Sequence, residues 1–588
     1  MYADDVSRRL VAVPVPSGTC MATLVEPGTT TPRTNHGVLV IPPLGIEHAG
    51  ADRLQRHFAD QAARLGHVVL TIEPVGTGDS TDLPCETDLV SAYGEALAGG
   101  VHTLVALGTD VTVFGIRFGA LAITTFLAAD AALRELVRAA VLIEPVAKGR
   151  NYRRELMLLG ASTSGGLPEG WAAPAGSVLR PSDLAAINRL DVAGTRAPAP
   201  FVLVAHERVD PLPGPTIEAW RTEAAVEFLS VAFERIVIED PELGEPLPEL
   251  AAGVIDWMGR LPPADGTVLS PLPAPPCFTA AGPSWREDTV ALSMTDGQML
   301  HGIRTCPPGP VLVGLVLLST GTNPRFGPAR LHTVIARRLS ALGVATLRIE
   351  RRGAGVDGRT VDAYSELHVG DARTIDAAAA ELLGAPRTVI AGMCSGAWAI
   401  WHAALEGLRA SDVVLMNQII FGEDSWDLSE SSPAMAVKTR QSLGDLERWR
   451  KIFRGEIRVK RSIRNLARYA ALATRNRFGS GATGLRSDLD TLAKLRTDVH
   501  FLFDRGESGL VYLNMRGKTT LSGLVNEGRI TIDVVSQAGH VFSSPQSVDW
   551  LWEMIARRCS IDAGTLRRAF PTVPPLLPPS AVGPPSAR

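Results

Sequence analysis

The chain has 588 residues, of which 45% are hydrophobic, and a mean hydropathy of +0.12, values typical of globular domains with well-filled cores. Its formal net charge of −4 excludes a global electrostatic attraction to nucleic acid or to an anionic membrane. The six cysteines form no C-x-x-C pair and no cluster with histidine at metal-ligand spacing, so we expect neither a disulfide framework nor a bound metal. The first residues do not resemble a secretory leader, and no apolar run approaches the roughly 20 residues of a membrane span, which predicts a cytoplasmic protein.

Two halves of the sequence repeat one another at an offset of about 277 residues. In each half, short apolar runs alternate with amphipathic stretches of helical spacing, such as residues 52–65 and 329–342. Strands that alternate with helices need crossover connections, so each half is predicted to form a mostly parallel sheet with helices on both faces. The matching strand runs are Gly37–Gly45 with Gly314–Gly321, Gly66–Asp79 with Gly343–Val356, Val111–Gly119 with Thr388–Gly396, Ala140–Pro145 with Val413–Gln418, and Phe201–Asp210 with Val499–Glu507.

The repeat divides the chain into two α/β domains, predicted to span residues 1–261 and 285–565. Residues 262–284 between them are rich in proline, alanine and glycine and are predicted to form a linker. Residues 566–588 form a proline-rich tail that we expect to be disordered.

Both halves place a glycine-flanked turn between a strand run and a helix-like run: Gly115-Ile-Arg-Phe-Gly119 in the first and Gly392-Met-Cys-Ser-Gly396 in the second. This is the layout of a nucleophile elbow, G-x-S-x-G, which holds a nucleophile on a sharp strand-to-helix turn. The glycines are required because side chains at these positions would clash with the neighbouring strand and helix.

In the first half, the nucleophile position holds Arg117, which cannot attack a carbonyl carbon at ordinary pH. A nucleophile at such an elbow works with a carboxylate and a histidine that follow it in the chain. The carboxylate is retained as Asp210, but no histidine follows directly after residues 235–239, which we predict to be the last strand. The first half is therefore predicted not to be a hydrolase by this mechanism. Three interpretations remain open: a decayed domain kept for packing, a site where Arg117 binds a carboxylate or phosphate as a bidentate fork, or an Arg117–Asp210 salt bridge.

In the second half, the nucleophile position holds Cys394. A sulfur at a helix N-terminus meets free N–H groups and the positive end of the helix dipole, and both favour the thiolate. The alternative interpretation is a buried structural cysteine in a glycine-rich turn.

These motifs resemble the α/β-hydrolase superfamily, and more closely two hydrolase families that accompany exosortase A systems of bacteria, here fused. The second half is similar to the type-one family at Leu300–Arg304, Arg352–Gly355, Gly392–Cys394 and Arg448–Gly455. The first half is similar to the type-two family at Pro42–Pro43, Gly76–Ser80, Gly115–Gly119 and Glu144–Val146. The resemblance implies acyl chemistry of the hydrolase type and gives little guidance on the substrate.

Between the two late strand runs of the second half lies an insertion, and in this fold such insertions form a helical cap over the site, here expected at about residues 422–495. Residues 438–477 within it are rich in arginine and lysine, and their apolar positions recur at helical steps. The charges predict either a solvated outer face or a surface that binds an anion, such as a CoA or phosphopantetheine thioester, a carrier protein or an anionic lipid surface. Nucleic acid is not expected, because no aromatic interleaving accompanies the basic residues.

A cysteine nucleophile needs a base, and the base needs an acid that orients it, in the chain order nucleophile, acid, histidine. A late strand run ends in Asp504-Arg-Gly-Glu507, and the repeat aligns Glu507 with Asp210, so Glu507 is the predicted acid and Asp504 the alternative. The predicted base is His540, which follows the last strand run in a Gly-His-Val-Phe sequence.

An oxyanion hole needs two hydrogen-bond donors near the sulfur. The N–H of Ser395, directly after the nucleophile, is predicted to be the first. The second is expected from the loop after Leu318, at Thr320, Gly321 or Thr322, and we choose Gly321.

These features predict a cysteine-dependent acyl hydrolase or acyltransferase in which Cys394 attacks an ester or thioester and His540 acts first as base and then as acid. Cysteine in place of serine fits thioester or acyl-transfer chemistry, and no cofactor is required. The expected partners are a small or carrier-bound acyl substrate, a weak anionic contact through the cap, and the other half of the same chain. The competing hypothesis is a non-catalytic scaffold or ligand-binding protein in which both elbows are vestigial.

Overall fold

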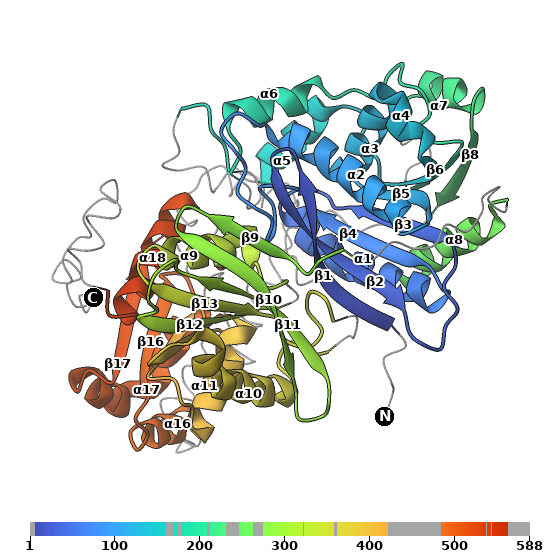
Figure 1. Cartoon of the computed structure of the whole chain (residues 1–588). Coiled ribbons are helices and arrows are strands. Elements are labelled where there is room, and N and C mark those ends of the chain that lie inside the picture. Colours follow the sequence, from blue (N-terminus) through green and yellow to red (C-terminus); the bar gives the residue numbers. More distant parts are fainter. Residues whose placement is uncertain are drawn as a thin grey trace, which may run out of the picture.

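The two halves of the chain form two mostly parallel β-sheets, each flanked by helices, which confirms the predicted fold class (Figure 1). The structure is a computed structural model. It describes residues 6–159, 169–173, 178–207, 212–230, 246–262, 275–321, 323–357, 361–421, 484–536, 538–542 and 544–561.

The first sheet has the strand order β1-β2-β4-β3-β5-β6-β7-β8. An antiparallel hairpin of β1 and β2 lies at one edge, and the strands from β4 to β8 are parallel. The strands are β1 (Val6–Val15), β2 (Gly18–Pro27), β3 (His36–Ile41), β4 (Val68–Glu73), β5 (Asp110–Ile116), β6 (Val137–Ile143), β7 (Phe201–His206) and β8 (Ala225–Ser230). The helices are α1 (Ile46–Arg64), α2 (Leu89–Ala106), α3 (Phe118–Ala129), α4 (Ala131–Glu135), α5 (Gly149–Leu159), α6 (Pro181–Arg189), α7 (Gly214–Arg221) and α8 (Pro248–Arg260).

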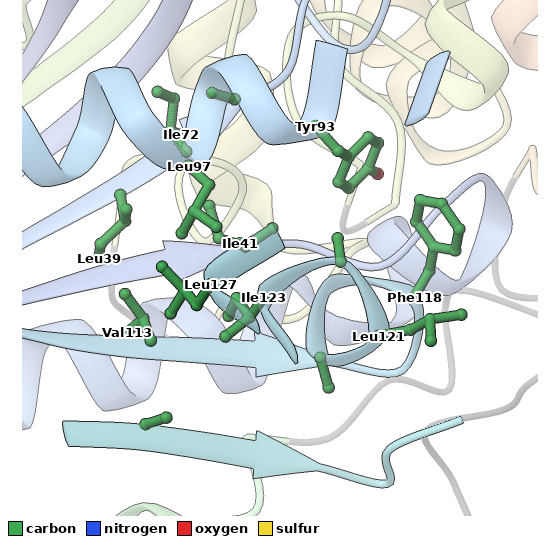
Figure 2. Close-up of a cluster of buried hydrophobic side chains, with 14 of the residues drawn as sticks. Leu39, Ile41, Ile72, Tyr93, Leu97, Val113, Phe118, Leu121, Ile123 and Leu127 are labelled. Carbon is green, nitrogen blue, oxygen red and sulfur yellow. The ribbon is translucent and has the colours of Figure 1, made fainter. Parts of the chain in front are cut away.

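Alternating side chains of the central strands divide the first domain into two cores, one on each face of the sheet. Val38 and Val40 of β3 pack with α1 and α8 on one face. Leu39 and Ile41 of the same strand pack with α2 and α3 on the other. Figure 2 shows this second core, in which Leu97 of α2 and neighbouring side chains of α3 face the strands.

The second sheet repeats this strand order as β10-β11-β13-β12-β14-β15-β16-β17 and adds β9 beside β10. Its strands are β9 (Thr279–Gly282), β10 (Trp285–Ser293), β11 (Met299–Cys306), β12 (Val313–Leu318), β13 (Val344–Ile349), β14 (Thr388–Met393), β15 (Asp412–Met416), β16 (Asp498–Asp504) and β17 (Ile530–Val535). A 3-10 turn (Pro328–Arg330) precedes the helices α9 (Leu331–Ser340), α10 (Glu366–Leu383), α11 (Ser395–Glu406), α16 (Leu485–Leu492), α17 (Ser508–Asn526) and α18 (Pro545–Arg558). Helices α9 and α18 cover one face, and α10, α11, α16 and α17 contribute to the core on the other.

Two predicted boundaries differ from the structure. The end of the predicted linker forms β9, and just before it the chain pairs with β1 of the first domain through Ala12 N–H to Pro276 O and Phe278 N–H to Leu10 O, both 3.0 Å. Pairing with two neighbours, rather than a hydrophobic pattern of its own, makes this small-residue segment extended. In the described part of the first domain the sheet ends at β8, which pairs with β7 and was not predicted, whereas the predicted run at residues 235–239 lies outside the described residues.

The two domains contact each other through a buried cluster of charged side chains. Asp79 of the first domain is fully buried and accepts from Arg348 Nη2 at 2.9 Å and Thr333 Oγ1 at 2.9 Å, both from the second domain. It also forms an ion pair with Arg325, whose Nε lies 2.8 Å from its Oδ2. A guanidinium of α9, that of Arg337, also donates to the backbone oxygen of Asp79 at 2.9 Å. Since so many buried donors converge on one carboxylate, the pairing of the domains is specified by charge as well as by apolar packing.

No helix in the described part of the chain combines the length and the apolar character that crossing a membrane requires.

Candidate active site

Cys394 lies on the sharp turn between β14 and α11. Its backbone angles, φ 49° and ψ −116°, belong to a region that costs a residue with a side chain about 1–2 kcal/mol. A Cβ atom on Gly392 would lie 2.7 Å from Ile400 Cδ1, and one on Gly396 would lie 2.8 Å from Ser319 O. The flanking glycines are therefore required by close packing, as the sequence predicts.

The predicted base and acid are in contact. His540 Nδ1 lies 3.0 Å from Glu507 Oε1, and His540 also hydrogen-bonds the side chain of Cys394. Because Nδ1 faces the carboxylate, the Nε2 atom is the one left for the sulfur. Burial lowers the pKa of His540, but the charges and hydrogen bonds of Cys394 and Glu507 outweigh it and raise the pKa well above 6.5.

Asp504, the alternative acid, has a different set of partners. Its Oδ1 accepts from Ala538 N–H at 2.9 Å and its Oδ2 from Gly506 N–H at 3.1 Å, so the carboxylate holds the backbone of the acid and histidine loops. Glu507 is therefore the carboxylate that contacts the imidazole, while Asp504 binds backbone N–H groups.

Asn417, which follows β15, connects the same two loops and was not singled out in the sequence. It is fully buried, its Nδ2 donates to His540 O at 2.6 Å and to Gly539 O at 3.2 Å, and its Oδ1 accepts from Asp504 N–H at 2.8 Å. Its φ of 42° is in the left-handed region, which asparagine tolerates better than most residues. A polar residue at the end of a buried strand run is the signal that could have identified it.

The predicted oxyanion donors have different positions. Ser395 is the first residue of α11, so its N–H is one that a helix leaves without an intrahelical acceptor. The N–H of Gly321, in contrast, donates to Ser395 Oγ at 2.8 Å. The choice of Gly321 as second donor is therefore wrong for this conformation, because its single hydrogen is already used. Of the alternatives, Thr320 is buried and Thr322 lies outside the described residues.

Arg351 lies beneath the elbow, and its guanidinium connects three segments of the site. The side chain is buried, Nη2 donates to Ser395 Oγ at 2.9 Å and to Gly321 O at 3.1 Å, and Nη1 donates to Ala363 O at 3.0 Å. This arginine precedes the Arg352–Gly355 motif, but the sequence contains no sign that its side chain turns inward. A buried cation at this point fixes the geometry of the elbow and of the loop after β12.

A third unpredicted residue, Tyr364, contacts the sulfur itself. Its Oη lies 3.6 Å from Cys394 Sγ, and its ring packs edge-on against Trp398 with centroids 5.6 Å apart. It lies just before α10, far from the elbow in sequence, and only the fold reveals the proximity.

The elbow of the first domain keeps its backbone conformation but carries a different side chain. Arg117 has φ 50° and ψ −107°, close to the angles of Cys394. Its guanidinium pairs with Glu47, at 3.2 Å from Nε, and with Glu155. Two carboxylates of this chain therefore already bind the guanidinium, which argues against Arg117 as a fork for a ligand anion. Its proposed partner Asp210 lies outside the described residues.

The space beside this elbow is filled by aromatic rings. Phe118, at the position equivalent to Ser395, is fully buried between Tyr93, at 4.9 Å, and Tyr152, at 5.3 Å between ring centroids. Residues 231–245, which follow β8 where a histidine loop would lie, contain no histidine. The first elbow thus carries an arginine where the second carries Cys394, and aromatic rings pack around it.

Most of the predicted basic cap, including residues 438–477, lies outside the described residues. The described end of the insertion is α16, whose Leu485, Leu489 and Leu492 are buried in the core. Among the residues that the structure describes, no group of three histidine, cysteine or acidic side chains is arranged to hold a metal ion.

Models of protein families give no match to the chain, and no curated protein matches it. Among solved structures, it is similar to a hypothetical protein from Pseudomonas aeruginosa, with 16% identity and a TM-score of 0.31, over 44% of this chain and 95% of that one. It is also similar to Est1E from Butyrivibrio proteoclasticus with bound ferulic acid, with 15% identity and a TM-score of 0.31, over 42% and 97%. A third is dienelactone hydrolase from Anabaena variabilis, with 14% identity and a TM-score of 0.27, over 47% and 96%. Neither identity nor TM-score is high enough to transfer a function, so the chemistry of the site has to come from its own residues.

Proposed function

We propose that this protein is a cysteine-dependent acyl hydrolase or acyltransferase whose second domain carries the active site. The observation on which the proposal rests is the contact series Cys394–His540–Glu507, with the sulfur on a strained elbow at the start of α11. A nucleophile, a base and an orienting acid in hydrogen-bond contact are the requirements of nucleophilic acyl transfer.

In the proposed reaction, His540 takes the thiol proton of Cys394, the sulfur attacks the carbonyl carbon of an ester or thioester, and the carbonyl π electrons move to oxygen. When the tetrahedral intermediate collapses, the bond to the leaving group breaks and His540 gives the leaving group its proton. Water or an acceptor hydroxyl or amine then attacks the acyl-cysteine while His540 removes its proton. When this second tetrahedral intermediate collapses, the carbon–sulfur bond breaks and His540 returns the proton to the sulfur, which restores the thiol. Glu507 stabilises the imidazolium at both stages.

The first domain is proposed to be a pseudo-hydrolase that acts as a structural partner of the second. This assignment is supported by Arg117 in place of a nucleophile, by the rings packed around Phe118, and by the lack of histidine in residues 231–245. The resemblance to two fused exosortase-associated families, the acyl carrier as partner and the anion-binding cap stay predictions.

The competing function is a scaffold in which Cys394 is inert. The left-handed backbone at Cys394 argues against this function, because such strain is usually kept where function needs it. Arg117 has the same strain without a nucleophilic side chain, so the strain alone does not decide between the two functions.

The test is covalent acylation. The purified full chain is incubated with p-nitrophenyl esters of short and medium chain length and with acyl-CoA thioesters, and its intact mass is measured over time. We expect an adduct of one acyl group that is absent from Cys394→Ala and retained in Cys306→Ala, a matched control that removes a half-buried thiol of the same domain. An adduct that persists without turnover would identify a transferase that lacks its acceptor.

The proposal is rejected if no substrate of the panel forms an adduct, or if the adduct survives in Cys394→Ala. The first outcome supports the scaffold function, and the second places the reactive group elsewhere.

A further inference from the structure

The structure brings the side chain of Tyr364, besides that of His540, to the sulfur of Cys394. Its hydroxyl lies 3.6 Å from Sγ, within hydrogen-bond range of a large atom such as sulfur. Two partners of different chemistry therefore face the nucleophile, an imidazole that can move a proton and a phenol that can donate a hydrogen bond.

With the N–H of Gly321 engaged elsewhere, the oxyanion hole of this site has room for a further donor. One donor is available at the N–H of Ser395, by its position at the start of α11. The second donor was expected on the loop after β12. In this loop the N–H of Gly321 donates to Ser395 Oγ instead. Arg351 holds this arrangement by donating to both Ser395 Oγ and Gly321 O, so reorienting the peptide would break several buried hydrogen bonds.

We propose that Tyr364 is a catalytic residue whose hydroxyl donates a hydrogen bond to the oxyanion formed when Cys394 is acylated. This inference rests on the proposed function, since it assumes acyl chemistry at Cys394. The oxyanion is two bonds from the sulfur, and a hydroxyl that already contacts the sulfur reaches it by a small rotation.

The surroundings of Tyr364 hold it for this role. Its ring rests edge-on against Trp398 of α11, the helix that also carries the Ser395 donor. Its backbone N–H donates to Asp362 Oδ1 at 2.8 Å, and the preceding carbonyl, Ala363 O, accepts from Arg351 Nη1 at 3.0 Å. The same arginine therefore positions the elbow, the loop after β12 and the tyrosine, which makes Arg351 a positioning residue for the donor pair.

The test compares two reactions of one thiolate in Tyr364→Phe, a substitution that removes only the hydroxyl. Acylation by a p-nitrophenyl ester passes through an oxyanion, whereas alkylation by iodoacetamide displaces iodide at a saturated carbon and forms none. We expect the acylation rate constant at saturating ester to fall about 10²- to 10³-fold, the loss typical of one missing oxyanion donor, and alkylation to stay within about threefold of wild type. Retained alkylation also shows that the variant is folded around Cys394.

Tyr152→Phe is the matched control, because it removes a buried hydroxyl beside the elbow of the first domain. Both of its rates should equal those of wild type within about threefold.

Three outcomes overturn the proposal. Unchanged acylation in Tyr364→Phe removes the hydroxyl from the reaction, and an equal loss in both reactions assigns it to the thiolate rather than to the oxyanion. Absence of any acyl adduct in wild type overturns the proposed function and, with it, the role of Tyr364. If wild type forms the adduct and Tyr364→Phe forms it at the same rate, only the role of Tyr364 is overturned.

Discussion

Within the second domain, Asp504 and Glu507 are close in sequence but differ in what they hold. Glu507 contacts the imidazole of His540, and Asp504 accepts two backbone N–H groups of the adjoining loops. The carboxylate pair thus separates two tasks, stabilising the imidazolium and fixing the loop that carries it.

Neutral isosteres of the two acids should therefore have different effects. Glu507→Gln removes the charge beside His540, and we expect the acylation rate to fall by about 10²-fold or more. Asp504→Asn loses one of two acceptors for buried N–H groups, which should lower the free energy of unfolding by about 1–3 kcal/mol while acylation of the folded fraction stays within about threefold. Stopped-flow acylation and urea unfolding measure the two quantities, and a reversal of the pattern would make Asp504 the acid.

The raised pKa of His540 extends this prediction to pH. Cys394 and Glu507 raise this pKa above 6.5, so the imidazolium persists past neutrality; its pairing stabilises the fold below about pH 6.5 and is lost as pH rises through the raised value. An alkyl ester has a poor leaving group that needs a proton from His540, so its acylation rate should decline as pH passes that pKa. Glu507→Gln removes a cause of the raised pKa and should move the decline to lower pH, whereas p-nitrophenyl esters, whose leaving group needs no proton, should not show it.

At the scale of elements, the two strand-to-helix turns show which part of an elbow is structural. Arg117 and Cys394 share a left-handed backbone although their side chains differ in chemistry. In the first domain a Cβ atom on Gly119 would lie 2.3 Å from Ile41 O, so the turn is locked by packing between sheet and helix. The conformation therefore does not depend on the side chain at the turn, since both a cysteine and an arginine adopt it.

Removing that side chain should expose how the first elbow is stabilised. Arg117→Met leaves Glu47 buried without its guanidinium, and breaking such a pair costs about 3–5 kcal/mol. Glu47 also accepts from Tyr152 Oη at 2.8 Å, a hydrogen bond that Glu47→Gln retains, so the double variant Arg117→Met/Glu47→Gln should recover at least half of the loss. Scanning calorimetry of the single and double variants measures this coupling. If Arg117→Met instead weakened substrate binding with no loss of stability, the first elbow would be a ligand site.

Local patterns in the sequence were sufficient to predict the fold. The paired glycines around residues 117 and 394 and the repeated strand runs are short-range signals, so both sheets followed from them. The strand at Ala225–Ser230 was not predicted because it has a largely exposed surface and no continuous apolar run. Tyr364, Asn417 and Arg351 could not be found in this way, because their roles depend on loops from separate strands that meet only in the fold.

The whole molecule is organised around a buried contact between the domains. Asp79, in the Gly76–Ser80 motif of the first domain, is held by arginines of the second, and both Asp79 and Arg348 are fully buried. Burial raises the pKa of Asp79, but Arg348 and Arg325 outweigh it and lower the pKa below 3.8, so the contact stabilises the protein above that pH and weakens as pH falls through the lower value. A motif that resembles a hydrolase signature thus acts here as an anchor for the partner domain.

Asp79→Asn should uncouple the two domains. The substitution leaves Arg325 and Arg348 buried without their shared carboxylate, at a cost of about 3–5 kcal/mol that falls on the interface. We expect wild type to unfold in one calorimetric transition and Asp79→Asn in two. If the second domain depends on its partner, acylation of Cys394 in Asp79→Asn should be lost at the transition with the lower midpoint temperature. Asp60→Asn is the matched control, since Asp60 forms a buried pair with Arg8, at 2.7 Å, within the first domain alone. It should lower the midpoint and keep a single transition. Two transitions in wild type, or an unchanged single one in Asp79→Asn, would mean that the ionic cluster does not join the domains and that apolar packing such as that of Phe278 against β1 and β2 is sufficient.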